Sequence, residues 1–184
     1  EPVRGVATEK LSEQLSPQSK ELIRSSVGYL VDWRDSATPK LLYQLFDTEV
    51  KIRVATRPLT ANIKRQGVRS FGYGTLFVSP KLTEDFPEDA LKILDSAAQV
   101  GLGVYSVESS TTPVGIDMGS RYFKVISKPN VLLASGAGTN AYRVGEIWHL
   151  LDTRVQMPVT RVGLDRLVNV DLSNYTHLLL TDPP

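Results

Sequence analysis

The stretch LFDTEVKIRVATRPL, residues 45–59, returns later in the chain as LLDTRVQMPVTRVGL, residues 150–164. The two stretches share six identities at a constant offset of 105, and each follows a short apolar run, at 27–31 and at 131–134. A repeat of this length is typical of a duplicated supersecondary unit rather than of a short solenoid repeat. We therefore expect a chain built from two related α/β units.

Apolar runs and alternating stretches mark the expected strands, and Pro residues mark the expected helix starts. Short connections between them favour parallel βαβ units in an open, doubly wound, mostly parallel sheet of the α/β class. Residues 59–70 are read as a basic connection without secondary structure. The expected strands are 27–31, 50–55, 74–79, 103–107, 122–126, 130–134, 159–162 and 177–181, and the expected helices are 19–25, 39–46, 87–98 and 144–151.

Four segments follow from this pattern. Residues 1–26 form a lead-in with a helix, 27–107 the first α/β unit, 108–129 a bridging segment and 130–184 the second α/β unit. The second unit is expected to be truncated, because it stops after its third strand whereas the first continues with a helix and a fourth strand. An unfinished parallel sheet leaves an edge near 177–181, and exposed edges invite self-association.

Composition restricts the chemistry more than it suggests a function. The 184 residues carry a formal net charge of +1, so nucleic acid is not an expected partner, and no apolar run is long enough to span a membrane. The chain has no cysteine, which excludes disulfides, thiolate zinc sites and a cysteine nucleophile, and it has only two histidines.

A Gly-rich turn between an expected strand and an expected helix is the best candidate for a small-molecule site. Glycines at such a turn let backbone N–H groups approach an anion at the helix N-terminus. The turn matches neither the dinucleotide fingerprint nor the Walker pattern, so a plain tight turn is the alternative. Its candidate ligand-binding residues are Ser135, Gly136, Gly138, Thr139 and Asn140.

Two single residues complete the candidates. His149 lies three residues before Asp152 on an expected helix and is placed near the Gly-rich turn, although a partly exposed histidine without partners is the alternative. Ser106 lies near the end of an expected strand, where a nucleophile elbow would be, but the serines after it lead into Thr111-Thr112-Pro113 rather than into a helix. No catalytic and no metal-binding residue is predicted.

Several strings together resemble one region of large bacterial zinc carboxypeptidases, the part after the peptidase domain, which has a class I glutamine amidotransferase-like, flavodoxin-like fold. The strings are PNVLLASG at 129–136, GEIWHLLD and Arg154 at 145–154, MPVT at 157–160, DMGS at 117–120 and DLS with Tyr175 at 171–175.

The resemblance implies a secreted or periplasmic metallocarboxypeptidase as the parent protein, with zinc in its peptidase domain. No His-x-x-Glu pair occurs in this chain, and the Cys-His-Glu machinery of amidotransferases lacks its cysteine, so no catalytic residue and no cofactor is carried over. We expect an accessory α/β domain that packs against the peptidase domain of the same chain, or binds substrate or a partner. The competing hypothesis is a small-molecule or anion-binding α/β module that uses residues 135–140.

Overall fold

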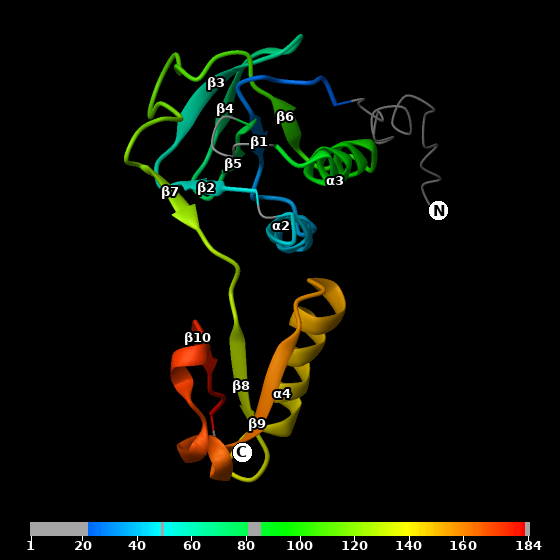
Figure 1. Ribbon diagram of the computed structural model, residues 1–184, viewed down its shortest axis with the longest axis vertical. Coiled ribbons are helices and arrows are strands. Elements are labelled where there is room, and N and C mark those ends of the chain that lie inside the picture. The colour runs from blue at the N-terminus through cyan, green and yellow to red at the C-terminus, as the bar shows by residue number, and fades with distance from the viewer. Residues whose placement is uncertain (1–21, 49, 81–85, 183–184) are drawn as a thin grey trace, which may run out of the picture.

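A computed structural model describes residues 22–48, 50–80 and 86–182 of this mixed α/β protein. Figure 1 shows two units, each with its own sheet, joined by the extended segment that follows β7. The first sheet has five strands in the order β6-β1-β5-β2-β7, and the second has three in the order β10-β8-β9. The five strands of the first sheet are β6 (Val104–Ser106), β1 (Tyr29–Val31), β5 (Leu76–Val78), β2 (Ile52–Ala55) and β7 (Phe123–Ile126).

Every neighbouring pair in the five-stranded sheet is antiparallel. The prediction of a mostly parallel sheet is therefore wrong for this unit. Helix α2 (Thr38–Phe46) connects β1 to β2 and helix α3 (Glu88–Gln99) connects β5 to β6. Each of these crossovers joins two strands that run in the same direction, but a strand of the other pair lies between them. Two interleaved βαβ units of this kind form a ferredoxin-like arrangement.

A β-hairpin replaces the connection that the sequence predicted over residues 59–70. It consists of β3 (Leu59–Ile63) and β4 (Gly67–Phe71), paired antiparallel. Along β3 the side chains alternate between buried and half-buried, as expected of a strand with one face on a core. The hairpin reverses the chain between β2 and β5, which explains why β5 runs antiparallel to β2.

The five-stranded sheet is buried on both faces. One face packs under α2 and α3 through residues such as Val31, Ile52 and Leu94. The other face packs under the hairpin and the segment between β6 and β7, through Leu30, Ile63 and Met118 among others. Full burial of a large aliphatic side chain stabilises a fold by about 1.5–3 kcal/mol, so both layers contribute to the stability of this unit.

Proline marks the helix starts where the sequence predicted them. α2 carries a proline in its first turn, and Pro87 is the N-cap residue of α3, whose first turn holds Glu88 and Asp89. Carboxylates at a helix N-terminus interact favourably with the helix dipole. The helix predicted at 19–25 is not formed over residues 22–25, and its earlier part lies outside the described residues.

The second unit has the parallel sheet that the sequence predicted. β8 (Val131–Ser135) lies between β9 (Val159–Gly163) and β10 (His177–Leu179), and both pairs are parallel. Helix α4 (Ala141–Trp148) crosses from β8 towards β9 and continues as a π-helix, His149–Arg154. α4 thus begins earlier than predicted, and a 3-10 helix, Leu164–Asn169, follows β9.

The two units touch at the end of α2. Tyr43 is buried together with Val131 and Met157 of the second unit, and Lys128 forms an ion pair with Asp47. The strand predicted at 122–126, in the bridging segment, is confirmed as β7, which pairs with β2 in the first sheet.

Candidate functional site

The predicted ligand-binding turn is a compact loop between β8 and α4. Gly136 and Gly138 have φ values of 89° and 90°, a region that L side chains rarely adopt. The Thr139 hydroxyl donates to the Gly136 carbonyl at 2.8 Å, and the Ser135 hydroxyl donates to the Val162 carbonyl at 3.3 Å. All five residues predicted from the sequence to bind a ligand therefore lie together in this loop.

The helix N-terminus at this loop is already capped by the protein itself. The Asn140 side chain accepts hydrogen bonds from the backbone N–H groups of Tyr142 and Arg143, at 3.1 and 3.2 Å. The backbone N–H of Asn140 donates to the Asp182 carbonyl at 3.2 Å, and Arg143 pairs with the Asp182 carboxylate. These backbone donors are not free to bind an anion, so the geometry favours a capping turn over an anion cradle.

The structure does not bring His149 to this loop. His149 is exposed and follows the last residue of α4, whereas the loop precedes its first residue. Eight helical residues separate the two ends by about 12 Å, at 1.5 Å per residue. The other histidine, His177, lies on β10, where its Nδ1 contacts the Thr176 hydroxyl at 2.8 Å.

Ser106 is not positioned as a nucleophile. It is buried on β6, and its hydroxyl donates to the backbone carbonyl of Ile23. A serine nucleophile needs a base within hydrogen-bonding reach, and both histidines of the chain belong to the second unit.

A network of charged groups that the sequence analysis did not single out lies at the end of β1. The guanidinium Nε of Arg34 donates to both carboxylate oxygens of Asp32, at 3.0 and 3.1 Å. The Arg34 Nη2 donates to Oδ2 at 2.5 Å, and the Arg34 backbone N–H donates to Oδ1 at 3.1 Å. The hydrogen-bonded guanidinium lowers the pKa of the Asp32 carboxyl, more than partial burial raises it. Asp32 is only 8 % exposed, and the hydrogen bonds from Arg34 favour its ionised form inside the fold.

Residues in and next to β6 and β4 lie near Asp32 and Tyr105. On one side, a Cβ atom at Gly103 would come within 3.0 Å of the Asp32 Cβ and 3.4 Å of the Tyr105 hydroxyl. The guanidinium carbon of Arg69, from β4, lies 4.2 Å from the centroid of the Tyr105 ring. The network thus connects the end of β1 with the hairpin, and its principal effect is to fix the loop that leads into α2.

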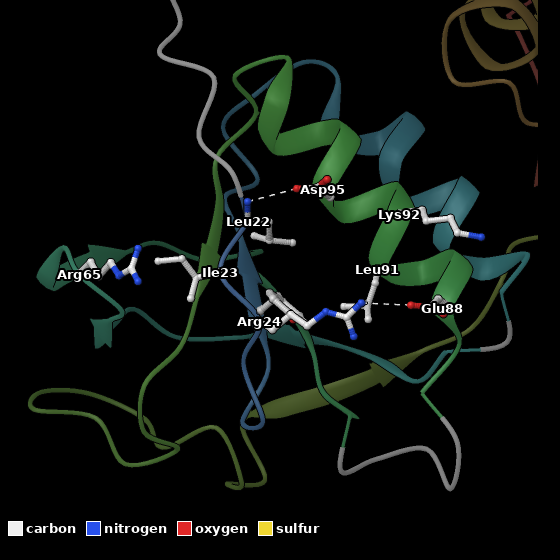
Figure 2. Close-up of a pocket in the computed structure, with 9 residues that line it drawn as sticks. Leu22, Ile23, Arg24, Arg65, Glu88, Leu91, Lys92 and Asp95 are labelled. Atoms are coloured by element: carbon white, nitrogen blue, oxygen red, sulfur yellow. Dashed lines mark hydrogen bonds and ion pairs between the residues drawn. The ribbon is translucent and has the colours of Figure 1, made fainter.

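Figure 2 shows one of the concave sites of the described residues, a cavity between α3, the hairpin turn and the segment before β1. Its volume is about 430 Å³. Arg24 and Glu88 form an ion pair at 3.1 Å, and the Leu22 backbone N–H donates to Asp95 at 3.2 Å. Arg65 enters from the hairpin turn with a φ of 59°, unusual for a residue other than glycine.

The cavity holds charges of both signs and offers no catalytic constellation. Two of its charged groups, Arg24 and Glu88, bind one another, and Lys92 pairs with Asp89. In the described ranges, no three His, Asp or Glu side chains come together as a metal ion would require. None of the described helices is long and apolar enough to cross a membrane.

Comparison of the chain with protein-family models, with curated proteins and with solved structures found no match.

Proposed function

We propose that this chain is an accessory, non-catalytic α/β domain of a protein similar to the large bacterial zinc carboxypeptidases, which remove C-terminal residues. The observation that carries the proposal is the placement of three resembling strings. Residues 129–136 contain β8, 145–154 cover the end of α4 and the π-helix, and 157–160 lead into β9. Strings separated in the sequence thus adjoin in one βαβ unit.

The strand order of the second sheet also supports the proposal. In chain order its strands are β8, β9 and β10, and in space they lie as second, first, third. Flavodoxin-like sheets begin with this order. The support is confined to the second unit, because the five-stranded sheet of the first unit is antiparallel.

An internal duplication is the second part of the proposal. In both copies of the repeated pattern a helix joins two strands that run in the same direction, β1 to β2 and β8 to β9. The copies differ in that β5 lies between the strands of the first pair, whereas the strands of the second pair are hydrogen-bonded neighbours.

Exposed apolar side chains on the second unit are consistent with a domain that packs against another one. Leu150 is 51 % exposed and Leu180 is 60 % exposed, and Trp148 and Leu178 are also exposed. A packing partner would cover exposed apolar side chains where they adjoin one another. We infer the peptidase domain of the same polypeptide as the partner, with zinc held there, in a secreted or periplasmic protein. Self-association through the β10 edge is the competing use of this surface.

Two measurements test the proposal. The complete coding sequence is expected to contain a His-x-x-Glu pair outside residues 1–184, and its absence would contradict the assignment. The purified chain, incubated with zinc chloride and a blocked peptide that ends in phenylalanine, is expected to release no phenylalanine above the level of a buffer control. Zinc-dependent release by this chain alone would show that the domain is itself catalytic.

A further inference from the structure

A groove between α2 and α3 is a second concave site of the first unit. The two helices lie on the same face of the five-stranded sheet, and the groove opens between them. Its volume is about 480 Å³, and small-molecule sites measure about 300–1,000 Å³. Leu41 and Ala97 form its floor and are only 3 % and 8 % exposed. Its rim includes exposed residues at both helices, among them Ala37, Ser96 and Val100. The groove therefore has a buried apolar floor and an open side.

Most side chains that line the groove are apolar. Ile93 and Leu102 are half-buried along it, and Val100 at its rim is 69 % exposed. Apolar surface in contact with water is unfavourable, and a ligand that covers it gains free energy in proportion to the area removed from water. The lining of the groove thus favours a ligand with an apolar part.

The charged side chains that line the groove are both lysines, and within the described ranges no acidic side chain lines it. Lys92 already pairs with Asp89 at 2.8 Å. Lys40 has no ion-pair partner among residues 22–48, 50–80 and 86–182. Because Lys40 is half-buried, its ammonium group loses part of its hydration without a carboxylate to compensate for it. A ligand that carries a carboxylate would supply the missing opposite charge.

We propose that the groove between α2 and α3 binds an alkanoate, a ligand with one carboxylate and one unbranched apolar chain. The carboxylate pairs with the ammonium group of Lys40, and the chain covers the floor formed by Leu41 and Ala97. One unpaired cation beside an apolar groove matches this ligand better than it matches an acidic amphipathic helix, which would bring several carboxylates to the groove. The site is independent of any relation to carboxypeptidases.

The test is a titration of the chain with sodium octanoate, decanoate and dodecanoate, each kept below the concentration at which it forms micelles. Calorimetry measures the affinity, and NMR of the methyl groups of Leu41 and Val100 locates the ligand. We expect saturable binding that tightens about fourfold for every two added methylene groups, as half-burial of these groups implies. Octylammonium chloride and octanol are the controls for charge, and both are expected to bind more weakly than octanoate.

Two variants test the assignment of the residues. Lys40→Gln is expected to weaken decanoate binding about fivefold, as the loss of a charge-assisted contact at a partly exposed site implies. Ser96→Trp is expected to abolish binding, because a large side chain at this exposed rim position fills the groove. The matched control is Gln99→Trp, since Gln99 is exposed on the same helix and does not line the groove.

Three results would overturn the proposal. They are decanoate binding that does not saturate below the micelle concentration, octylammonium binding as tight as that of octanoate, and decanoate binding that both Lys40→Gln and Ser96→Trp leave unchanged. If no alkanoate binds, the acidic helix of a partner protein becomes the better candidate for the groove.

Discussion

The two copies of the repeated pattern fold into crossovers with different neighbours. In the first copy, β1 and β2 are held apart by β5, and both faces of the sheet are covered. In the second copy, β8 and β9 pair directly, and the sheet ends after three strands. The comparison teaches that a shared local pattern specifies a strand–helix–strand crossover but leaves open what lies between and around its strands.

Residues that match in the repeat occupy different environments. Leu45 is completely buried within α2, whereas its counterpart Leu150 is 51 % exposed within the π-helix. A π-helix has a wider turn than an α-helix, so side chains that follow its start point in other directions. Tyr43 and its counterpart Trp148 differ in the same sense, since Tyr43 is buried and Trp148 is exposed.

Truncation of the matched leucines gives the largest expected difference between the copies. Leu45→Ala is expected to lower the free energy of unfolding by about 3 kcal/mol, because it creates a cavity in a packed core. Leu150→Ala is expected to lower it by about 0.5 kcal/mol or less, as is usual for exposed positions. Urea unfolding followed by circular dichroism measures both. Equal losses would show that Leu150 is buried in solution, by self-association or by rearrangement.

The ion pairs at the two strand-to-helix loops are expected to respond differently to acid. Because Arg34 lowers the pKa of Asp32 below the usual value of 3.8, the pair stabilises the fold above that pH. This stabilisation is lost as the pH falls through the lowered pKa. In Arg34→Gln the carboxyl titrates nearer its usual value, so the loss of stability between pH 5 and pH 2 becomes smaller.

The matched variant is Arg143→Gln in the second loop. Both side chains of the Arg143–Asp182 pair are more than half exposed, so no measurable change in acid stability is expected. Urea unfolding at several pH values compares the two variants. A steeper acid dependence in Arg34→Gln than in the parent protein would contradict the assigned direction of the Asp32 pKa.

The caps of the two helices provide a smaller contrast. α4 has a side-chain cap from Asn140, whereas α2 has none. Asn140→Ala is expected to destabilise the second unit by about 1 kcal/mol. Asn169→Ala is the control, since Asn169 is exposed and is the last residue of a 3-10 helix rather than an N-cap residue. The hydrogen-exchange rates of the α4 amides measure this loss of stability. Unchanged rates would show that other contacts hold the loop 135–140.

The smallest expected effect concerns ligands at the Gly-rich loop. Because Asn140 and Asp182 occupy backbone donors at this loop, a panel of anionic metabolites without a long alkyl chain is expected to leave the melting temperature unchanged. A rise in melting temperature that Asn140→Ala abolishes would instead support the small-molecule-binding hypothesis.

The sequence predicted most elements because their signals are local. Proline marked the starts of α2 and α3, and apolar runs marked strands such as β1 and β8. The hairpin was missed because small Ala61 weakens the alternation in β3, and its turn, with Arg65 at positive φ, lacks the usual Asn-Gly signal. The antiparallel order of the first sheet depends on that hairpin, so both were missed together.

The candidate sites also differ in whether their residues are close together in the sequence. The Gly-rich loop is contiguous, and the sequence located it fully, although its capping by Asp182 depends on a residue 42 positions after Asn140. The contact between Asp32 and Arg34 is also local, but its closure by Arg69 and Tyr105 requires the hairpin and β6. The contact of the Arg53 guanidinium with the Met118 carbonyl joins residues 65 positions apart, and no short sequence pattern predicts it.

The interleaving of β1 between β5 and β6 has a consequence for the order in which the protein forms. Leu30 pairs with Phe77 on one side and with Tyr105 on the other, so both neighbours of this apolar strand are synthesised long after it. Until residue 106 has left the ribosome, β1 has at least one unpaired edge, and such edges promote aggregation. Pairing at such distances along the chain also slows folding. A nascent chain that stalls between β5 and β6 is therefore the form of this protein most in need of a chaperone.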